Sequence, residues 1–147
     1  MLRGFQVFVS GIALAGFTLA GASVAAAQDA AKPVLTLDGD AAVITVLIKP
    51  DKTAEFESVL SKLKESLNKS DKPERKQQLA GMKVFKSTQQ SNGSAVYILI
   101  FDPVVKGQEY DFTRLIAEVF PVEVQEVFQK YKESFVGRAI ASLTKVQ

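Results

Sequence analysis

The chain has 147 residues with 18 basic and 16 acidic side chains, so its charges are nearly balanced. It lacks the large basic excess that would indicate a nucleic acid or an anionic membrane surface as a partner. It contains no histidine and no cysteine, which excludes disulfides, the common zinc, copper and haem ligand sets, and nucleophilic triads with a histidine base. No P-loop, dinucleotide fingerprint or G-x-S-x-G elbow is present. The sequence therefore indicates no cofactor and no metal, and it names no reaction.

Residues 1–27 have the features of an export signal that is removed. Arg3 gives a basic start, residues 5–22 form an apolar run rich in alanine and glycine, and residues 24–27 supply the small side chains that a signal peptidase requires. A membrane anchor is the alternative interpretation of the apolar run. We expect cleavage after Ala27, no membrane attachment afterwards, and a protein that is periplasmic or secreted.

Residues 28–41 are predicted to form a flexible lead-in, and residues 42–147 a single α+β domain. Within the lead-in, residues 34–37 fit either a short strand or an extended arm. Residues 42–49 predict a strand that is apolar on both faces and ends at Pro50. The apolar spacing of residues 53–68 predicts a helix, with Asp51 as its N-cap.

Residues 69–78 carry charges of alternating sign, and we interpret them as a solvated link in which Pro73 interrupts any helix. A basic patch that docks a partner is the alternative. Residues 81–88 predict a second strand, more polar than the first and therefore suited to a sheet edge. Asn92 and Gly93 predict a hairpin turn that leads into a third strand at residues 94–101.

The third strand is apolar on both faces. Side chains alternate along a strand, so Leu99 points to one side of the sheet and Ile98 to the other. A strand of this kind requires an apolar cover on both sides. The helices of so short a chain supply one cover, and we expect a second copy of the chain to supply the other.

The C-terminal third of the chain predicts two helices and a strand. Residues 112–119 form the first helix, with Asp111 as its cap, and the second follows Pro121 and ends at Gly137 as its C-terminal cap. Residues 138–147 fit a strand or a helical continuation. The strand is favoured because β-propensity rises after Gly137.

The resulting order is strand, helix, strand, strand, helix, helix, strand, and it resembles the dimeric α+β barrel superfamily, which includes antibiotic-biosynthesis monooxygenase-like and stress-responsive barrel proteins. The resemblance implies a ferredoxin-like antiparallel sheet with helices on one face, and a homodimer that forms through the other face. It implies no catalytic residue, because this chain lacks the histidine and tryptophan that members of the superfamily use. The segments that carry the resemblance are residues 42–49, 56–67, 82–85 and 95–101.

Four polar residues are candidates for ligand binding: Lys83, Tyr97, Tyr110 and Arg114. If the third strand lines a cavity, Tyr97 donates a hydrogen bond into it and Lys83 acts there as a base. The alternatives are that Tyr97 packs with its hydroxyl at the rim, that Lys83 is a solubilising edge residue, and that Arg114 pairs with a neighbouring carboxylate.

Three functions follow from these observations. The first is a non-catalytic exported homodimer that binds a small apolar ligand or a partner, which fits the absence of catalytic groups. The second is a cofactor-free monooxygenase-like or isomerase-like enzyme in which Tyr97, Lys83 and Arg114 orient the substrate. The third is an envelope protein-interaction module that docks a partner through residues 69–78.

Overall fold

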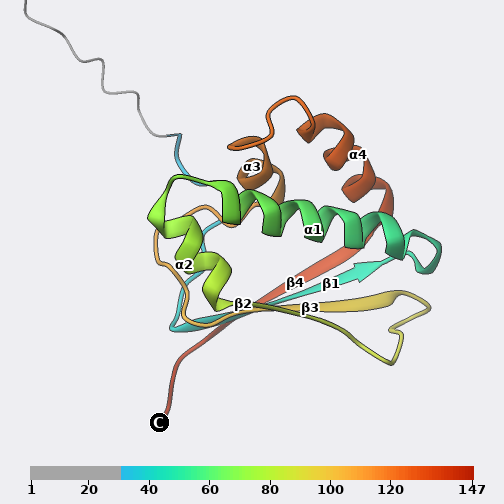
Figure 1. Ribbon diagram of the computed structural model, residues 1–147. Coiled ribbons are helices and arrows are strands. Elements are labelled where there is room, and N and C mark those ends of the chain that lie inside the picture. The colour runs from blue at the N-terminus through green and yellow to red at the C-terminus, as the bar shows by residue number, and fades with distance from the viewer. Residues whose placement is uncertain (1–30) are drawn as a thin grey trace, which may run out of the picture. The chain divides into compact units, whose positions relative to one another are not determined.

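The computed structural model describes residues 31–147, which form one compact α+β unit (Figure 1). The predicted export signal at residues 1–27 lies outside the described residues. No helix among residues 31–147 has the length and apolar content needed to cross a bilayer. The elements, in chain order, are β1 (Ala41–Ile48), η1 (Pro50–Lys52), α1 (Thr53–Lys69), α2 (Pro73–Gly81), β2 (Met82–Lys86), β3 (Ala95–Phe101), α3 (Phe112–Ala117), α4 (Val124–Ser134) and β4 (Phe135–Leu143).

The four strands form one antiparallel sheet in the order β2-β3-β1-β4. β1 lies in the interior of the sheet, where it pairs with β3 on one side and with β4 on the other. β2 and β4 are the two edge strands. Strand pairing therefore brings the start of the domain together with its last element.

Alternate residues of the two inner strands have different surroundings. One set on β1 and β3 is buried, including Ile44 and Leu99 at 0% exposure, whereas the residues between them remain partly exposed. The buried set packs with the apolar stripe of α1, which contains Phe56 and Leu63. α1 lies along this face of the sheet and contacts α2, α3 and α4 (Figure 1). The alternation expected for residues 94–101 thus separates a core face from a second face.

The hairpin between β2 and β3 turns at the residues that the sequence indicated. Asn92 has φ +48° and Gly93 has φ +76°, and Ser91 pairs with Ser94 across the turn. Such left-handed conformations are the requirement of a two-residue hairpin turn, and asparagine and glycine adopt them at least cost. This part of the prediction is confirmed.

The expectation that residues 69–78 form a solvated link is wrong. Pro73 begins α2 instead of interrupting a helix, since its missing N–H and fixed φ suit the first turn. Arg75 and Gln78 are buried at 4% and 1% exposure. Gly81, expected at the start of the second strand, is the last residue of α2.

Two predicted helix caps are also wrong. α4 ends at Ser134, and Gly137 lies within β4 instead of capping the helix. β4 therefore begins three residues before the predicted tail strand, although the choice of strand over helix is correct. At the other end, Asp51 is part of the short turn η1, and α1 follows with no side-chain cap.

Candidate functional site

The largest unexplained feature is the second face of the sheet, which we call the open face. Directly paired residues of antiparallel strands point to the same side, so the strand register defines its members. They are Lys83 and Phe85 on β2, Val96, Ile98 and Ile100 on β3, Ala41, Val43, Thr45 and Leu47 on β1, and Gly137, Ala139, Ala141 and Leu143 on β4.

Every member of the open face is at least partly exposed, and nearly all are apolar. Phe85 has 52% of its surface exposed, which is unusual for a large aromatic side chain. Lys83 is the single ionisable residue of this face, and Thr45 is its single hydroxyl. A contiguous apolar surface of this kind marks a binding or association site.

The structure does not bring the candidate residues Lys83 and Tyr97 together. Tyr97 lies on the core face of β3 with 2% exposure, whereas Lys83 lies on the open face of β2. A side chain on one face cannot share a cavity with one on the other, because the sheet separates them. The cofactor-free enzyme hypothesis therefore has no common site for its two principal residues.

Tyr97 takes part in a small polar cluster at the edge of the core face. Its hydroxyl donates to Glu57 Oε1 at 2.6 Å, and Lys86 Nζ donates to the same oxygen at 2.9 Å. These two hydrogen bonds, from Tyr97 first and Lys86 second, lower the pKa of Glu57. Burial, and then the bond to Glu57, raise the pKa of Tyr97, so its hydroxyl stays protonated and acts as a donor.

A shallow pocket of about 260 Å³ lies beside this cluster. Its lining residues are Glu57, Leu60, Ser61, Lys64, Val84, Lys86 and Tyr97. Lys83, Tyr110 and Arg114 are not among them. Of the four candidates for ligand binding, only Tyr97 therefore lines a pocket here.

Tyr110 lies in the segment that links β3 to α3, and Arg114 lies in the first turn of α3. Tyr110 is 1% exposed, its ring packs edge-on against Phe101 at 4.9 Å between centroids, and its hydroxyl accepts from the backbone N–H of Val105 at 2.8 Å. Arg114 is exposed, and its backbone N–H donates to Asp111 Oδ1 at 3.0 Å, which confirms Asp111 as the cap of α3. Tyr110 thus stabilises the linking segment, and the backbone of Arg114 takes part in the cap of α3.

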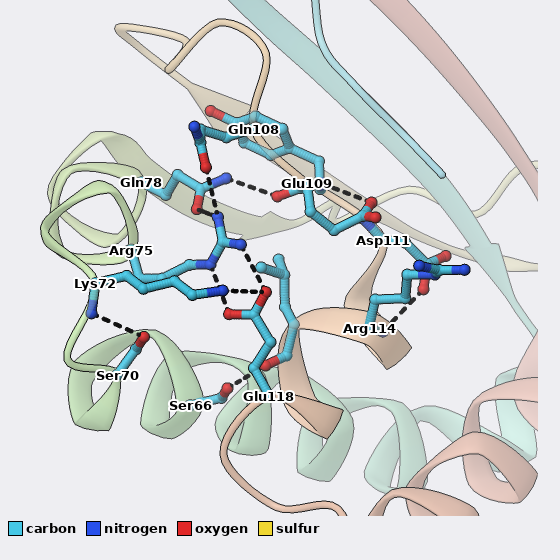
Figure 2. Close-up of polar contacts among 12 residues, drawn as sticks. Ser66, Ser70, Lys72, Arg75, Gln78, Gln108, Glu109, Asp111, Arg114 and Glu118 are labelled. Carbon is cyan, nitrogen blue, oxygen red and sulfur yellow. Dashed lines mark hydrogen bonds and ion pairs between the residues drawn. The ribbon is translucent and has the colours of Figure 1, made fainter. Parts of the chain in front are cut away.

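A buried polar cluster that the sequence did not reveal joins α2 to the end of α3 (Figure 2). Arg75 Nε donates to Glu118 Oε2 at 2.9 Å and Arg75 Nη2 to Glu118 Oε1 at 2.7 Å. Arg75 Nη1 also donates to the side-chain oxygens of Gln78 and Gln108. Burial raises the pKa of Glu118, but the bonds from Arg75 and Lys72 outweigh it and hold that pKa below its usual value.

Glu109 holds the segment that precedes β1. Its carboxylate accepts from the backbone N–H groups of Val34 at 2.7 Å, Leu35 at 3.0 Å, Tyr110 at 3.0 Å and Asp111 at 2.8 Å. Burial opposes the charge of Glu109, yet these four donors keep its pKa below the usual value. Residues 34–37 form an extended arm and not a strand. Leu37 of this arm is buried in the core, with 1% of its surface exposed.

No signal in the sequence points to these two polar clusters. Arginine, glutamine and glutamate are mostly exposed in proteins, so a charged segment predicts a solvated surface unless its partners are known. Two partners of Arg75, Glu118 and Gln108, lie at the end of α3 and in the loop before it. Two of the four donors to Glu109 are backbone N–H groups of residues 34 and 35, far away in the chain. Only the three-dimensional arrangement reveals them.

In the part of the chain that the structure describes, no group of three or more acidic side chains is placed to hold a metal ion. Comparison with protein-family models, with curated proteins and with solved structures found no match for this chain. The assignment of a function therefore rests on its own residues, and the open face is the feature that most requires an explanation.

Proposed function

We propose that this chain is a non-catalytic homodimer in which two open faces pack together and hold a small apolar ligand between them. The sheet order β2-β3-β1-β4, with α1 along the core face, supports a ferredoxin-like half of an α+β barrel. The observation that carries the proposal is the composition of the open face, where Lys83 is the only ionisable side chain. Removal of such a surface from water lowers the free energy, so burial of the open face favours association.

The size of the open face fits an interface between two chains. Four strands of five to nine residues, spaced about 4.8 Å apart and rising about 3.4 Å per residue, span roughly 500 Å² in projection. A stable complex buries about 800 Å² on each partner. The sheet therefore supplies more than half of that area, and the hairpin at residues 87–94 and the tail at residues 144–147 adjoin it at its two ends.

The chemistry of the face sets the class of the ligand. Thr45 offers one hydroxyl near the centre, and Lys83 is confined to an edge strand. A charged or strongly polar molecule would lose its hydration without a matching partner. We therefore propose an uncharged, largely hydrocarbon ligand, held by an exported protein after removal of residues 1–27.

The test is the mass of the native protein, residues 28–147, and of three variants. Ile98→Asp places a charge on the open face, Leu99→Asp places one in the core, and Gln129→Asp adds the same charge on exposed α4 as a control. We expect a dimer for the native chain and for Gln129→Asp, and a folded monomer for Ile98→Asp. Leu99→Asp unfolds the subunit, because it buries an unpaired charge.

Native mass spectrometry reports the subunit count, and circular dichroism reports the fold. A native chain that remains monomeric at high micromolar concentration, or an Ile98→Asp variant that remains dimeric, would contradict the proposed interface. A dimer whose native mass exceeds twice the chain mass, with the excess lost on denaturation and extractable into an organic solvent, identifies the bound apolar molecule. A dimer without such an excess mass would support the proposed interface and contradict the proposed ligand.

A further inference from the structure

The open face is uneven from one edge to the other. Its β2 and β3 side carries large residues, Phe85, Val96, Ile98 and Ile100. Its β4 side carries Gly137, Ala139 and Ala141, with one large residue, Leu143, at the end of the strand. One row across the sheet shows the gradient, since the register aligns Phe85, Ile98, Thr45 and Ala139 in that order. The single charge, on Lys83, lies on the same side as the large residues.

Two symmetric arrangements bring a pair of such faces together with aligned strands. A two-fold axis that runs along the strands, between β3 and β1, places β2 of one copy over β4 of the other. A two-fold axis that runs across the strands places β2 over β2 and β4 over β4. Both are isologous contacts of the kind that homodimers use.

Packing separates the two arrangements. With β2 over β2, two Phe85 rings and two rows of large aliphatic side chains meet along one edge. Along the other edge, the glycine and alanine residues at positions 137, 139 and 141 leave a gap over most of the length of β4. Protein interiors are close-packed, so a gap of this kind forfeits contacts along its whole length. With β2 over β4, large residues face small ones along both edges.

Charge favours the same arrangement. With β2 over β2, both Lys83 ammonium groups lie along one edge of the dimer, where their repulsion adds to the crowding. With β2 over β4, the two ammonium groups lie at opposite edges. Each one extends past the short side chains of β4 into water, because a lysine stem can lie on an apolar surface while its charge remains hydrated.

We infer that β2 of each subunit packs over β4 of its partner, so that Phe85 lies over the partner's Ala139. This inference rests on the proposed dimer and specifies its register, by which we mean which strands of the two sheets face each other. Phe85 and Ala139 then act as a pair of specificity-determining residues, because a large residue at position 139 and a large residue at position 85 cannot occupy the same interface.

The natural absence of cysteine makes cross-linking a clean test. Three variants of residues 28–147 are compared: Phe85→Cys, Ala139→Cys and the double variant, each treated with a short bis-maleimide. Within one subunit the two positions lie on opposite edge strands, about 14 Å apart across three strand spacings, whereas packed sheets are about 10 Å apart. The reagent is chosen to span the second distance and not the first.

We expect the double variant to be linked at twice the chain mass on a denaturing gel, and each single variant to remain unlinked. Linkage of Phe85→Cys to itself overturns the register and shows β2 over β2 in a dimer that still exists. A double variant that stays unlinked although native mass spectrometry shows a dimer also overturns it. A native chain that is monomeric overturns the dimer and the register together, so the two failures are distinguishable.

A bump-and-hole pair checks the same contact without a reagent. Ala139→Phe is expected to weaken the dimer at least tenfold, and adding Phe85→Ala in the same chain is expected to recover most of that loss, because each change recurs at both symmetric contacts. Both positions are exposed in the subunit, so neither change disturbs its core. Failure of Phe85→Ala to recover affinity overturns the inferred register.

Discussion

Arg75 and Glu118 form a two-point ion pair, in which two nitrogens of the guanidinium donate to the two oxygens of one carboxylate. The Arg75 side chain is 5% exposed, whereas that of Glu118 is 26% exposed. The pair joins α2 to the end of α3, and both helices also contact α1. The buried ion pair thus attaches α2, which is rich in polar and charged residues, to the rest of the domain.

Glu118→Ala is expected to destabilise the domain by about 3 kcal/mol, because it leaves the buried Arg75 charge without its partner. Glu126→Ala is the matched control, since Glu126 pairs with Lys130 on the exposed surface of α4, where water screens the pair and its loss leaves the stability nearly unchanged. Urea unfolding of both variants measures the difference. Equal midpoints for the two variants would contradict a structural role for the Arg75 pair.

Glu109 is expected to make stability depend on pH in the acidic range. Its pKa is lowered from 4.5 on folding. Its contribution to the free energy of unfolding is therefore present above pH 4.5 and is lost as the pH falls through the lower pKa of the folded state. Glu109→Gln is less stable at pH 7 by about 1–3 kcal/mol, because the amide leaves backbone donors unsatisfied.

The measurement is the urea midpoint from pH 7 to pH 3 for native chain and variant. Glu57 and Glu118 also have lowered pKa values, so the native chain loses stability in acid from several groups, and the diagnostic quantity is the difference between the two curves. That difference narrows as the pH falls below 4.5. Amide hydrogen exchange at Val34 and Leu35 speeds up in the variant at neutral pH, while exchange in β3 remains slow.

Gly39 and Gly93 both have positive φ, at +85° and +76°, but their surroundings differ. A Cβ at Gly93 would meet nothing within 4 Å, so Gly93→Ala costs only the backbone strain, about 1 kcal/mol. A Cβ at Gly39 would lie 2.6 Å from the carbonyl oxygen of Leu143, which also accepts from the N–H of Asp40. We expect Gly39→Ala to cost clearly more in thermal unfolding, and equal losses would contradict this contact.

Tyr97→Phe removes the hydroxyl that donates to Glu57 and keeps the ring, whose centroid lies 4.8 Å from that of Phe56. We expect a loss of about 1 kcal/mol and a rise in the pKa of Glu57 towards 4.5, because its strongest hydrogen bond is gone. Carbon-detected NMR titration of Glu57 measures the pKa. Lys86→Met is the comparison, and it is expected to raise that pKa by a smaller amount.

The sheet and its two faces could be predicted from local patterns. Alternation in residues 94–101 indicates that Ile98 and Leu99 need separate covers, and the stripe of residues 53–68 indicates the helix that covers one of them. Asn92 and Gly93 specify the hairpin through their own backbone preferences. These features depend on neighbouring residues alone, so the sequence contains the information directly.

Other features depend on partners that are distant in the chain. α2 has little apolar pattern, so its sequence predicts that Arg75 and Gln78 are exposed to solvent. A proline can begin a helix or end one, and the residues around Pro73 do not decide between the two. β4 starts at Phe135 because its pairing with Ile48 takes precedence over Gly137 as a helix cap. The separation of Tyr97 from Lys83 follows from the register of β2 against β3, which no single segment determines.

The pairing of β1 with β4 has a consequence for how the domain is assembled. Ile44 lies beside Ile140, so β1 remains an edge strand until nearly the whole chain has been synthesised. Contacts between such distant positions slow folding, because a long loop must close before they form. A chain that stops before Phe135 therefore loses one of the two strands that flank β1, and with it half of the ladder that holds the first strand in the sheet.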